Sequence, residues 1–321
     1  MLSDMTSTTA VGRRPIAALG IAISTYRRPE LLRALLDSIA RQRFAGEAPE
    51  ITISIADNSS DLEGMAVARE VAPSFRWPIL IDHEPQPGIA TTRNRTVRLL
   101  GDQDAIVFID DDETASPEWL DRLVRTAVDF DADVVSGPVL PRFSQPPPAW
   151  VVTGRFYERP RHRTGTITGT TATSNLLVRG LVFDELGDPW FDPSLGLIGC
   201  DDTHFLERAQ RRGHPSVWCD EATVSETFPP ERVSVRWLVQ RQFRGGNSYV
   251  IVQRMVAPGW RTTAQIIAKA SIRTVVSVAA LPVAALRPVS RVWALRSIAT
   301  GVGQLAGYVN VRYAEYAHKD T

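Results

Sequence analysis

The chain carries a cluster of carboxylates directly after an apolar run. Residues 106–109 read Ile-Val-Phe-Ile, and residues 110–113 read Asp-Asp-Asp-Glu. The apolar run is typical of a buried strand, and ligands of open α/β sheets bind beyond the carboxyl ends of such strands. Crowded carboxylates repel one another unless a cation lies among them, and hard oxygen ligands suit Mg²⁺ or Mn²⁺. The pattern predicts a divalent cation that bridges to phosphates, whereas a solvated acidic turn is the structural alternative.

A second acidic pair, Asp201-Asp202, lies at the start of a helix predicted over residues 202–212 and closed by Gly213. Carboxylates at a helix N-terminus are stabilised by its unpaired N–H groups, so capping would explain the pair without any catalytic role. The functional interpretation is a general base, because a hydroxyl that attacks an electrophilic carbon must lose its proton. His204 on the same helix has three interpretations: a solvated residue, a phosphate contact or a metal ligand.

Strands and helices alternate over the first half of the chain and must position these acids. One predicted helix shows the amphipathic period, with Leu31, Leu32, Leu35, Leu36 and Ile39 on a single face. This alternation predicts an α/β fold with a mostly parallel, three-layer central sheet. The predicted strands span residues 16–24, 51–56, 78–81, 105–109 and 172–178, and the predicted helices span 29–41, 62–71, 90–100 and a segment after Ser116.

Three further loops place polar side chains at the same predicted edge of the sheet. They span residues 24–28, 57–61 and 87–94. Within them, Asp57 could accept a hydrogen bond from a base N–H, and Arg93 could bind a phosphate through two guanidinium nitrogens. Each loop alone is explained by ordinary turn chemistry. Their expected convergence predicts a single nucleotide pocket.

The composition indicates a globular protein and argues against nucleic acid as a partner. Acidic and basic residues balance at 36 each in a chain of 321 residues. The two cysteines, Cys200 and Cys219, do not make a disulfide framework, and free thiols are typical of a reducing compartment. Residues 1–15 lack the apolar segment of a signal peptide and are expected to form a disordered leader. A cytoplasmic location is therefore predicted.

We expect the α/β domain to cover residues 16–250, with a nucleotide-binding half at about 16–140 and an acceptor half at about 141–250. The segment 141–170 is rich in Pro, Arg and Gly and predicts a long surface excursion. A basic helix is predicted over about 232–244, ending at Gly245-Gly246. Residues 251–321 then predict a helical C-terminal extension.

The helical extension mixes apolar runs with arginines. Its longest apolar run, residues 275–286, contains Pro282 and is shorter than the ~20 residues that span a bilayer, so no transmembrane helix is predicted. An apolar helix flanked by arginines can lie in a membrane interface. We therefore expect residues 258–321 to make peripheral contact with the inner face of the plasma membrane. A core-packing or dimerising helix pair is the alternative.

Several short motifs follow one another between about residues 21 and 249. They are Thr25-Tyr26-Arg27-Arg28-Pro29, Ala56-Asp57-Asn58, Gly88-Ile89-Ala90 with Arg93-Asn94, Phe108-Ile109-Asp110-Asp111-Asp112-Glu113, Thr173-Ser174-Asn175, Asp201-Asp202, and Glu226 followed by Arg232. In their order and spacing they resemble glycosyltransferase family 2, which has the GT-A fold. The likeness is greatest to bacterial exopolysaccharide β-glucosyltransferases of the succinoglycan-assembly type.

The resemblance implies an inverting transfer of a single hexose from a UDP-sugar to a glycan or lipid-linked acceptor, in cell-surface or exopolysaccharide biosynthesis. It also implies that the hexose is glucose. Asp112 and Asp110 would hold Mg²⁺ or Mn²⁺, with Glu226 near the metal or the diphosphate. Asp202 would be the catalytic base. The family usually shows Gly-Gly-Glu-Asp where this chain has Gly-Cys-Asp-Asp; the shorter Asp201, placed with Asp202 in the catalytic pair, departs from the family's acceptor-binding glutamate but leaves Asp202 in register. The residues expected around the nucleotide sugar are Thr25, Tyr26, Arg28, Asp57, Asn58, Arg93, Asn94, Asp110 and Asp111.

The predicted basic helix brings Arg232, Arg236 and Arg244 near one stripe. The functional interpretation is a lid that contacts the diphosphate of UDP or of a lipid-linked acceptor, and a solvated arginine face is the alternative. Residues 240–244 depart from the Gln-x-x-Arg-Trp motif of processive family members. Addition of a single residue is therefore predicted rather than polymerisation.

Two other functions are compatible with acids that follow a strand. The first is a metal-dependent nucleotidyl or phosphoryl transferase. A phosphatase of the haloacid-dehalogenase type would need an aspartate nucleophile where the first strand ends, and this chain has Ser24-Thr25 there. The second is a non-catalytic subunit that binds a sugar nucleotide.

Overall fold

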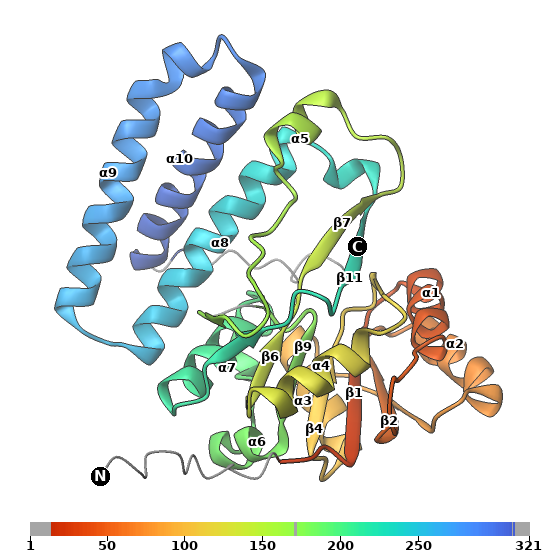
Figure 1. Ribbon diagram of the computed structural model, residues 1–321. Helices are drawn as coiled ribbons and strands as arrows, with labels where there is room; N and C mark the ends of the chain where they lie inside the picture. The colour runs from red at the N-terminus through yellow and green to blue at the C-terminus, as the bar shows by residue number, and fades with distance from the viewer. Residues whose placement is uncertain (1–13, 170–171, 310, 312–321) are drawn as a thin grey trace, which may run out of the picture.

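The computed structural model describes residues 14–169, 172–309 and 311, and it places an α/β domain beside three long helices (Figure 1). The leader predicted over residues 1–15 lies almost wholly outside the described residues. The strands of the main sheet are β1 (Ala18–Thr25), β2 (Glu50–Asp57), β3 (Ile79–His83), β4 (Ala105–Phe108), β6 (Val134–Ser136), β8 (Ile167–Thr168), β9 (Leu176–Arg179) and β10 (Ser216–Trp218).

The main sheet has the order β3-β2-β1-β4-β9-β6-β10-β8. Its first four positions are parallel, with β1 paired to both β2 and β4. β9 runs antiparallel to β4 and to β6, and β10 is parallel to β6. The prediction of a mostly parallel sheet is confirmed; β9, which overlaps the strand predicted over 172–178, is antiparallel, and so is the two-residue edge strand β8.

Helices cover both faces of this sheet, so the predicted three layers are confirmed. Successive side chains of a strand point to opposite faces, and β1 sends Leu19, Ile21 and Ile23 to one face and Ala22 to the other. The first face is covered by α1 (Pro29–Ala40), α2 (Glu63–Val71) and α4 (Trp119–Asp129). The second is covered by α3 (Ile89–Leu100), α6 (Gly180–Leu186) and α7 (Asp201–Arg211).

A second, three-stranded sheet lies beside the end of β4. It consists of β5 (Glu113–Ala115), β7 (Val139–Phe143) and β11 (Val224–Phe228), with β11 in the middle. β5 and β11 are antiparallel, and their register sets Glu113 opposite Glu226. This sheet therefore brings Glu226 close to the acids that follow β4, although more than a hundred residues separate them in the sequence.

The first long helix, α8 (Val235–Val256), begins at a Ser234 cap, whose hydroxyl accepts a hydrogen bond from the Trp237 amide at 3.2 Å. The predicted end at Gly245-Gly246 is wrong, because α8 continues through both glycines to Val256. Gly246 is retained in the helix because a Cβ there would lie 2.3 Å from the Thr300 carbonyl oxygen of a neighbouring helix. The glycine permits close packing rather than ending the helix.

The C-terminal extension forms two further long helices, α9 (Trp260–Ala284) and α10 (Pro288–Tyr308). α10 contacts both α8 and α9 and lies between them (Figure 1). Among the described residues, α9 is the one helix long and apolar enough to cross a membrane by length and composition. The sequence prediction of no transmembrane helix considered only the apolar run at 275–286, whereas α9 begins at Trp260 and is longer than that run.

Shorter elements complete the chain. They are α5 (Ala149–Gly154) and the 3-10 turns η1 (Ala72–Ser74), η2 (Pro193–Leu195) and η3 (Pro230–Arg232). An aromatic cluster joins α8 to the second sheet, with Tyr157 stacked on Trp237 at a ring distance of 5.6 Å and both rings against Phe228. This cluster fixes Trp237, at the N-terminal end of α8, against the second sheet.

Candidate active site

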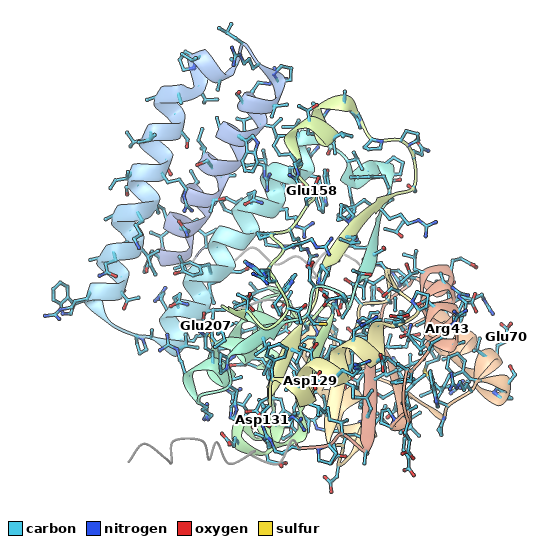
Figure 2. The ribbon with its side chains drawn as sticks, in the orientation of Figure 1. Arg43, Glu70, Asp129, Asp131, Glu158 and Glu207 are labelled. Carbon is cyan, nitrogen blue, oxygen red and sulfur yellow. The ribbon has the colours of Figure 1, made fainter. Side chains whose placement is uncertain are left out.

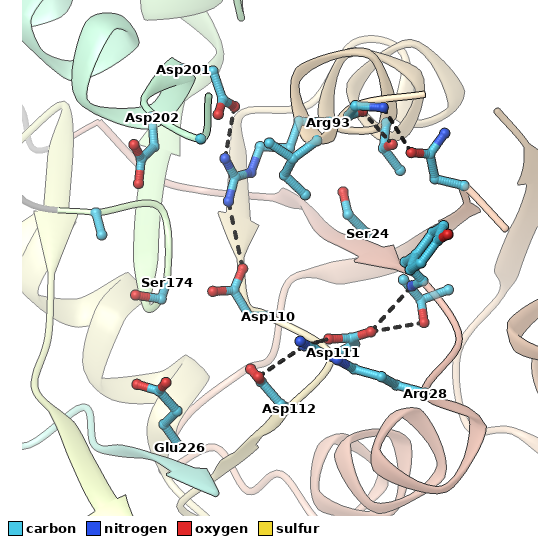
Figure 3. A pocket seen from close by; sticks show the side chains of 18 of the residues that line it. Ser24, Arg28, Arg93, Asp110, Asp111, Asp112, Ser174, Asp201, Asp202 and Glu226 are labelled. Carbon is cyan, nitrogen blue, oxygen red and sulfur yellow. Dashed lines mark hydrogen bonds and ion pairs between the residues drawn. The ribbon is translucent and has the colours of Figure 1, made fainter. Parts of the chain in front are cut away.

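A cavity of about 310 Å³ opens beyond the carboxyl ends of β1, β2 and β4 (Figure 3). Its lining includes the three aspartates of the acid cluster, Asp110, Asp111 and Asp112, and also the acidic pair Asp201-Asp202 at the start of α7. Loops that follow β1 and β2 and precede α3 contribute as well, so the predicted convergence is observed. The two acidic groups face one another across a single cavity.

The acid cluster is held by hydrogen bonds from the loop after β1. Asp111 is buried, and its Oδ2 accepts from the Thr25 hydroxyl at 2.9 Å. Arg28 Nη1 donates to Asp111 Oδ1 and to Asp112 Oδ2, both at 2.8 Å. The sequence placed Arg28 and Thr25 with the nucleotide sugar. In the structure both line the cavity, and both also brace the acids.

The acids at the cavity floor suit a cation. Burial, together with the charges of Asp112 and Asp111, raises the pKa of Asp110 to about 7 against the opposing charge of Arg93. Burial and the neighbouring acids also raise the pKa of Glu113 well above its usual range. Such shifts indicate negative charge that the protein alone leaves poorly balanced. The hard oxygens of Asp110, Asp112 and Glu226 fit a divalent ion chemically.

The conformation described here does not gather those oxygens into a closed ligand set. Among the described residues, no three carboxylate, imidazole or thiol side chains converge closely enough to hold a metal ion. Asp112 Oδ2 is instead engaged by Arg28 and lies 3.4 Å from Arg232 Nη1. Metal ligation by Asp112, Asp110 and Glu226 therefore requires these side chains to turn inward.

Arg93 connects the two acidic groups (Figure 3). Its Nη1 donates to Asp201 Oδ2 at 2.7 Å, and its Nη2 lies 3.7 Å from Asp110 Oδ1. Burial alone would lower the pKa of Arg93, but the charges of Asp201, Asp110 and Asp202 outweigh it and raise that pKa. The sequence prediction that Arg93 binds phosphate overlooked this ion pair.

Asp201 and Asp202 are adjacent but differ in environment. Asp201 has no exposed surface, burial raises its pKa, and its buried Oδ1 accepts no hydrogen bond from any residue that the structure describes. Asp202 is half-buried, and its Oδ1 accepts from the Thr203 amide at 2.6 Å. Figure 3 shows the Asp202 carboxylate pointing into the cavity. The geometry therefore favours Asp202 for contact with a reacting group, and Asp201 for positioning.

Four guanidinium groups line the side of the cavity formed by α8 and the second sheet. This arginine wall consists of Arg159, Arg232, Arg241 and Arg244. Arg159 Nη2 donates to Glu226 Oε2 at 2.8 Å, so Glu226 is paired with an arginine here. Burial, together with the charges of the other three guanidinium groups, lowers the pKa of Arg241 to about 10 against the opposing charge of Glu226. Mutual repulsion of this kind is relieved by a bound anion.

Sequence reasoning missed Arg159, Arg241, Trp237 and Ser174 as cavity residues. The stripe that it chose, Arg232, Arg236 and Arg244, assumes a helix that includes residue 232. Because α8 begins at Val235, the face toward the cavity is Trp237, Arg241 and Arg244, which is the i, i+4, i+7 spacing. A prediction that started the helix at Val235 could have found this spacing from the sequence. Arg232 reaches the cavity from η3, whereas Arg236 is exposed and does not line it.

Two further predictions are wrong as direct contacts. The Asn94 side chain is buried and spans the Phe191 backbone, donating to its carbonyl at 2.7 Å and accepting from its amide at 3.0 Å. His204 is buried away from the cavity, its Nδ1 has no partner among the described residues, and burial lowers its pKa. Both residues face the interior because they lie on the packed sides of α3 and α7.

Asp57 and Asn58 at the end of β2 brace the loops that line the cavity. Asp57 is fully buried, and its two oxygens accept from the amides of Ser59 and Met65 at 2.9 and 3.0 Å. Asn58 lines the cavity and donates to the carbonyls of Glu84 and Gln86. Tyr26 also lines the cavity. Of these predicted nucleotide contacts, Asp57 is thus placed behind the lining.

Residues 20–187 match the sequence family described as Glycosyl transferase family 2. The chain is 34% identical over 232 residues to the succinoglycan biosynthesis protein ExoM of Rhizobium meliloti (strain 1021), covering 72% of this chain and 74% of that one.

Solved glycosyltransferases share the fold. A mannosyltransferase of Pyrobaculum calidifontis in complex with GDP-Man and Mn²⁺ superposes with a TM-score of 0.59 at 17% identity, covering 92% of this chain and 88% of that one. TarS residues 1–349 of S. aureus in complex with UDP-GlcNAc superpose with a TM-score of 0.52 at 16% identity, covering 92% and 93%. Together with the family match, these likenesses show that the fold is GT-A and that the chain belongs to glycosyl transferase family 2.

Proposed function

We propose that the protein transfers a single hexose from a UDP-sugar to a hydroxyl of a glycan or lipid-linked acceptor, with inversion at the anomeric carbon. The likeness to the succinoglycan type favours glucose as this hexose. The observation that carries the proposal is the meeting of the acid cluster and the acidic pair across one cavity. The name of the Rhizobium meliloti relative supports a role in exopolysaccharide biosynthesis. The UDP-GlcNAc complex of TarS supports a uridine nucleotide, because the same fold holds it there.

Asp202 acts as the general base in this proposal. The acceptor oxygen attacks the anomeric carbon, the bond from that carbon to the UDP oxygen breaks, and the acceptor proton passes to Asp202. Because the oxygen enters opposite the departing UDP, an α-linked donor gives a β-glycoside. Asp201 and Arg93 position the first turn of α7, through the 2.7 Å ion pair, so that Asp202 stays directed into the cavity.

The departing diphosphate lies between the acid cluster and the arginine wall in this proposal. A divalent ion held by Asp112 and Asp110, with Glu226 near it, would supply Lewis-acid stabilisation of the leaving group. Arg232, Arg241 and Arg244 offer guanidinium groups to the phosphate oxygens from the opposite side. Part of the charge that develops on UDP is thus balanced by the chain itself.

The nucleoside lies against the loops that follow β1 and β2, where Thr25, Tyr26 and Asn58 line the cavity. Asp57 supports this pocket by fixing the amides of Ser59 and Met65. The identity of the nucleotide base can differ between proteins of this fold, because the structure of the Pyrobaculum calidifontis mannosyltransferase contains GDP-Man. A competition between uridine and guanosine nucleotides therefore tests this part of the proposal.

The test is a thermal-unfolding screen of the full chain with UDP-glucose, UDP-GlcNAc and GDP-mannose, each with Mn²⁺ and with a chelator. A ligand that binds the native state raises the unfolding midpoint by mass action. We expect a UDP-sugar to raise it in Mn²⁺ and to do so far less with the chelator. A GDP-mannose shift equal to that of the UDP-sugars would contradict the uridine assignment, and the absence of any shift would contradict the donor class.

A further inference from the structure

The C-terminal part of the chain carries a one-sided charge. Residues 232–311 contain eleven Lys and Arg residues and no Asp or Glu, although the whole chain balances at 36 of each sign. The remainder of the chain therefore has 25 basic against 36 acidic residues. On α9 itself, Arg261, Lys269 and Arg273 are exposed. A cationic surface of this kind attracts anionic partners.

α9 exposes far more apolar surface than it buries. Its buried residues are Ile266 and Ala270, and the Ser277 hydroxyl donates to the Ser297 hydroxyl of α10 at 2.8 Å. Its outer face is aliphatic. The exposed fractions there are 67% for Val275, 61% for Val276 and 75% for Val283, while Leu286 just beyond the helix is 82% exposed. Exposed apolar surface of this extent marks a contact site.

The outer face of α9 is held rigidly to the catalytic domain. α10 lies between α9 and α8, and glycines let these helices approach closely (Figure 1). A Cβ at Gly303 would lie 2.1 Å from the Phe243 carbonyl oxygen, and one at Gly301 would lie 2.2 Å from the Thr274 hydroxyl. Since α8 also carries Trp237, Arg241 and Arg244 of the cavity, whatever covers α9 is fixed in orientation relative to the active site.

The charges of α9 favour a surface over a passage through the bilayer. The helix has 25 residues, a mean hydropathy of 1.6 and only 11% of its most apolar stretch buried. Lys269 and Arg273 lie near its middle, where a spanning helix would carry both charges to the bilayer centre, an unfavourable place for a charged side chain. Both lie beside the aliphatic stripe rather than within it, which is the arrangement of an interfacial helix.

A second copy of the chain fits the same face less well. A symmetric contact would bring two cationic surfaces together, and within residues 232–311 no acidic residue is present to offset their repulsion. An anionic lipid surface satisfies both observations at once, because its acyl region accepts the valines and its headgroups accept the cations.

We propose that the outer face of α9 docks in the plane of an anionic phospholipid surface, with Lys269 and Arg273 at the headgroups and Val275, Val276 and Val283 among the upper acyl chains. The proposal rests on the exposed face and its charge and not on the transfer reaction. The membrane proposal can therefore fail while the glycosyltransferase assignment stands. It can also hold if the proposed transfer reaction is wrong.

The test is cosedimentation of the full chain with vesicles of phosphatidylcholine alone and of phosphatidylcholine mixed with phosphatidylglycerol. We expect binding to the mixed vesicles, release at high salt, and little binding to phosphatidylcholine alone. Lys269→Gln with Arg273→Gln should weaken binding by roughly thirtyfold, or about fivefold for each cation. The matched control is Arg41→Gln with Arg43→Gln, which removes two exposed cations; Arg43 lies on the far side of the molecule from α9 (Figure 2).

A second variant tests the apolar half of the surface. Val276→Glu with Val283→Glu should abolish vesicle binding without changing the thermal unfolding midpoint, since both side chains are exposed. Equal binding to both vesicle types, or equal weakening by the Arg41 and Arg43 control, would overturn the proposal. So would binding that resists both high salt and alkaline carbonate, which indicates a spanning helix. Absence of vesicle binding, with a dimer in sedimentation that Val276→Glu and Val283→Glu dissociate, would assign the face to a second copy instead.

Discussion

Arg93 Nη1 lies 2.7 Å from Asp201 Oδ2, and this buried ion pair ties α3 to the first turn of α7. Asp201 is fully enclosed, and Arg93 also approaches Asp110 on the opposite side of the cavity. The pair therefore sets the spacing between the acid cluster and the first turn of α7, which carries Asp202. A buried pair of this kind is costly to break from one side only, because the remaining charge has no partner.

Arg93→Met should destabilise the fold by about 3–5 kcal/mol, because it leaves the Asp201 carboxylate buried without its cation. The free energy of unfolding from chemical denaturation measures this. The double variant Arg93→Met with Asp201→Asn should recover a large part of the loss, since it removes the buried charge as well. A single variant as stable as the wild type, or a double variant no better than the single one, would contradict the role given to the pair.

Asp112→Asn should weaken Mn²⁺-dependent UDP binding at least about tenfold, because loss of a ligand costs no less than the 10–100-fold typical of its supporting residues. Calorimetry with UDP, in Mn²⁺ and in chelator, separates the metal-dependent part of the affinity. Asp102→Asn, an exposed acid on the loop before β4, is the control. If the variant binds UDP in Mn²⁺ as tightly as the wild type, Asp112 is not a metal ligand.

Gly245 and Gly246 are neighbours in α8, and alanine should have opposite effects at the two positions. A Cβ at Gly245 meets nothing within 4 Å, so Gly245→Ala should stabilise the helix by about 0.5–1 kcal/mol. A Cβ at Gly246 would lie 2.3 Å from the Thr300 carbonyl oxygen, so Gly246→Ala should force α8 and α10 apart and lower the unfolding midpoint. Equal effects of the two substitutions would show that the helices do not pack as described.

His214 should make stability depend on pH. Its Nδ1 and Nε2 contact Asp133 Oδ2 at 2.8 Å and Glu185 Oε2 at 3.0 Å, and Arg14 pairs with the same Asp133. Burial alone would lower the pKa of His214, but the two carboxylates outweigh it and raise that pKa. The charged imidazole then stabilises the fold fully below the ordinary histidine pKa of about 6.5, and this is lost as the pH rises through the folded value.

His214→Gln should therefore lower the thermal midpoint more at about pH 5.5 than well above the ordinary histidine pKa of about 6.5. The exposed His162, substituted in the same way, is the control for a general effect of removing a histidine. A gap between wild type and His214→Gln that stays constant or widens with rising pH would contradict the assignment.

The sequence predicted those parts of the fold that local patterns determine. Leu32, Leu35 and Leu36 repeat at helical spacing and are all buried in α1, and the apolar strands β1 and β4 are parallel neighbours in the predicted mostly parallel sheet. The role of Gly246 could not be predicted in this way. Its backbone is ordinary helix, and a glycine is required there only because Thr300 of α10 lies so close. A glycine in a helical pattern is ambiguous until the neighbouring helix is placed.

The candidate site was predictable where each residue follows its own strand. Asp110, Asp112 and Thr25 are examples, since the ends of parallel strands must meet at one edge. Pairings between distant segments were not predictable: Arg159, on the segment after α5, meets Glu226 of β11, which lies 67 residues further along the chain. Asn94 was misassigned because a polar side chain on a helix can bind either a ligand or a backbone amide. The tertiary fold brings the Phe191 backbone to it, which the sequence does not show.

The central claim is that Asp202 takes the acceptor proton while the acid cluster holds the donor. The most direct measurement compares donor affinity and transfer rate in Asp202→Asn, with Glu207→Gln on the same helix as the control. We expect the Asp202 variant to bind the UDP-sugar as the wild type does and to lose about 10²–10⁴-fold in turnover, with the control unaffected. Wild-type turnover in Asp202→Asn, or loss of donor binding in proportion to the loss of turnover, would contradict the claim.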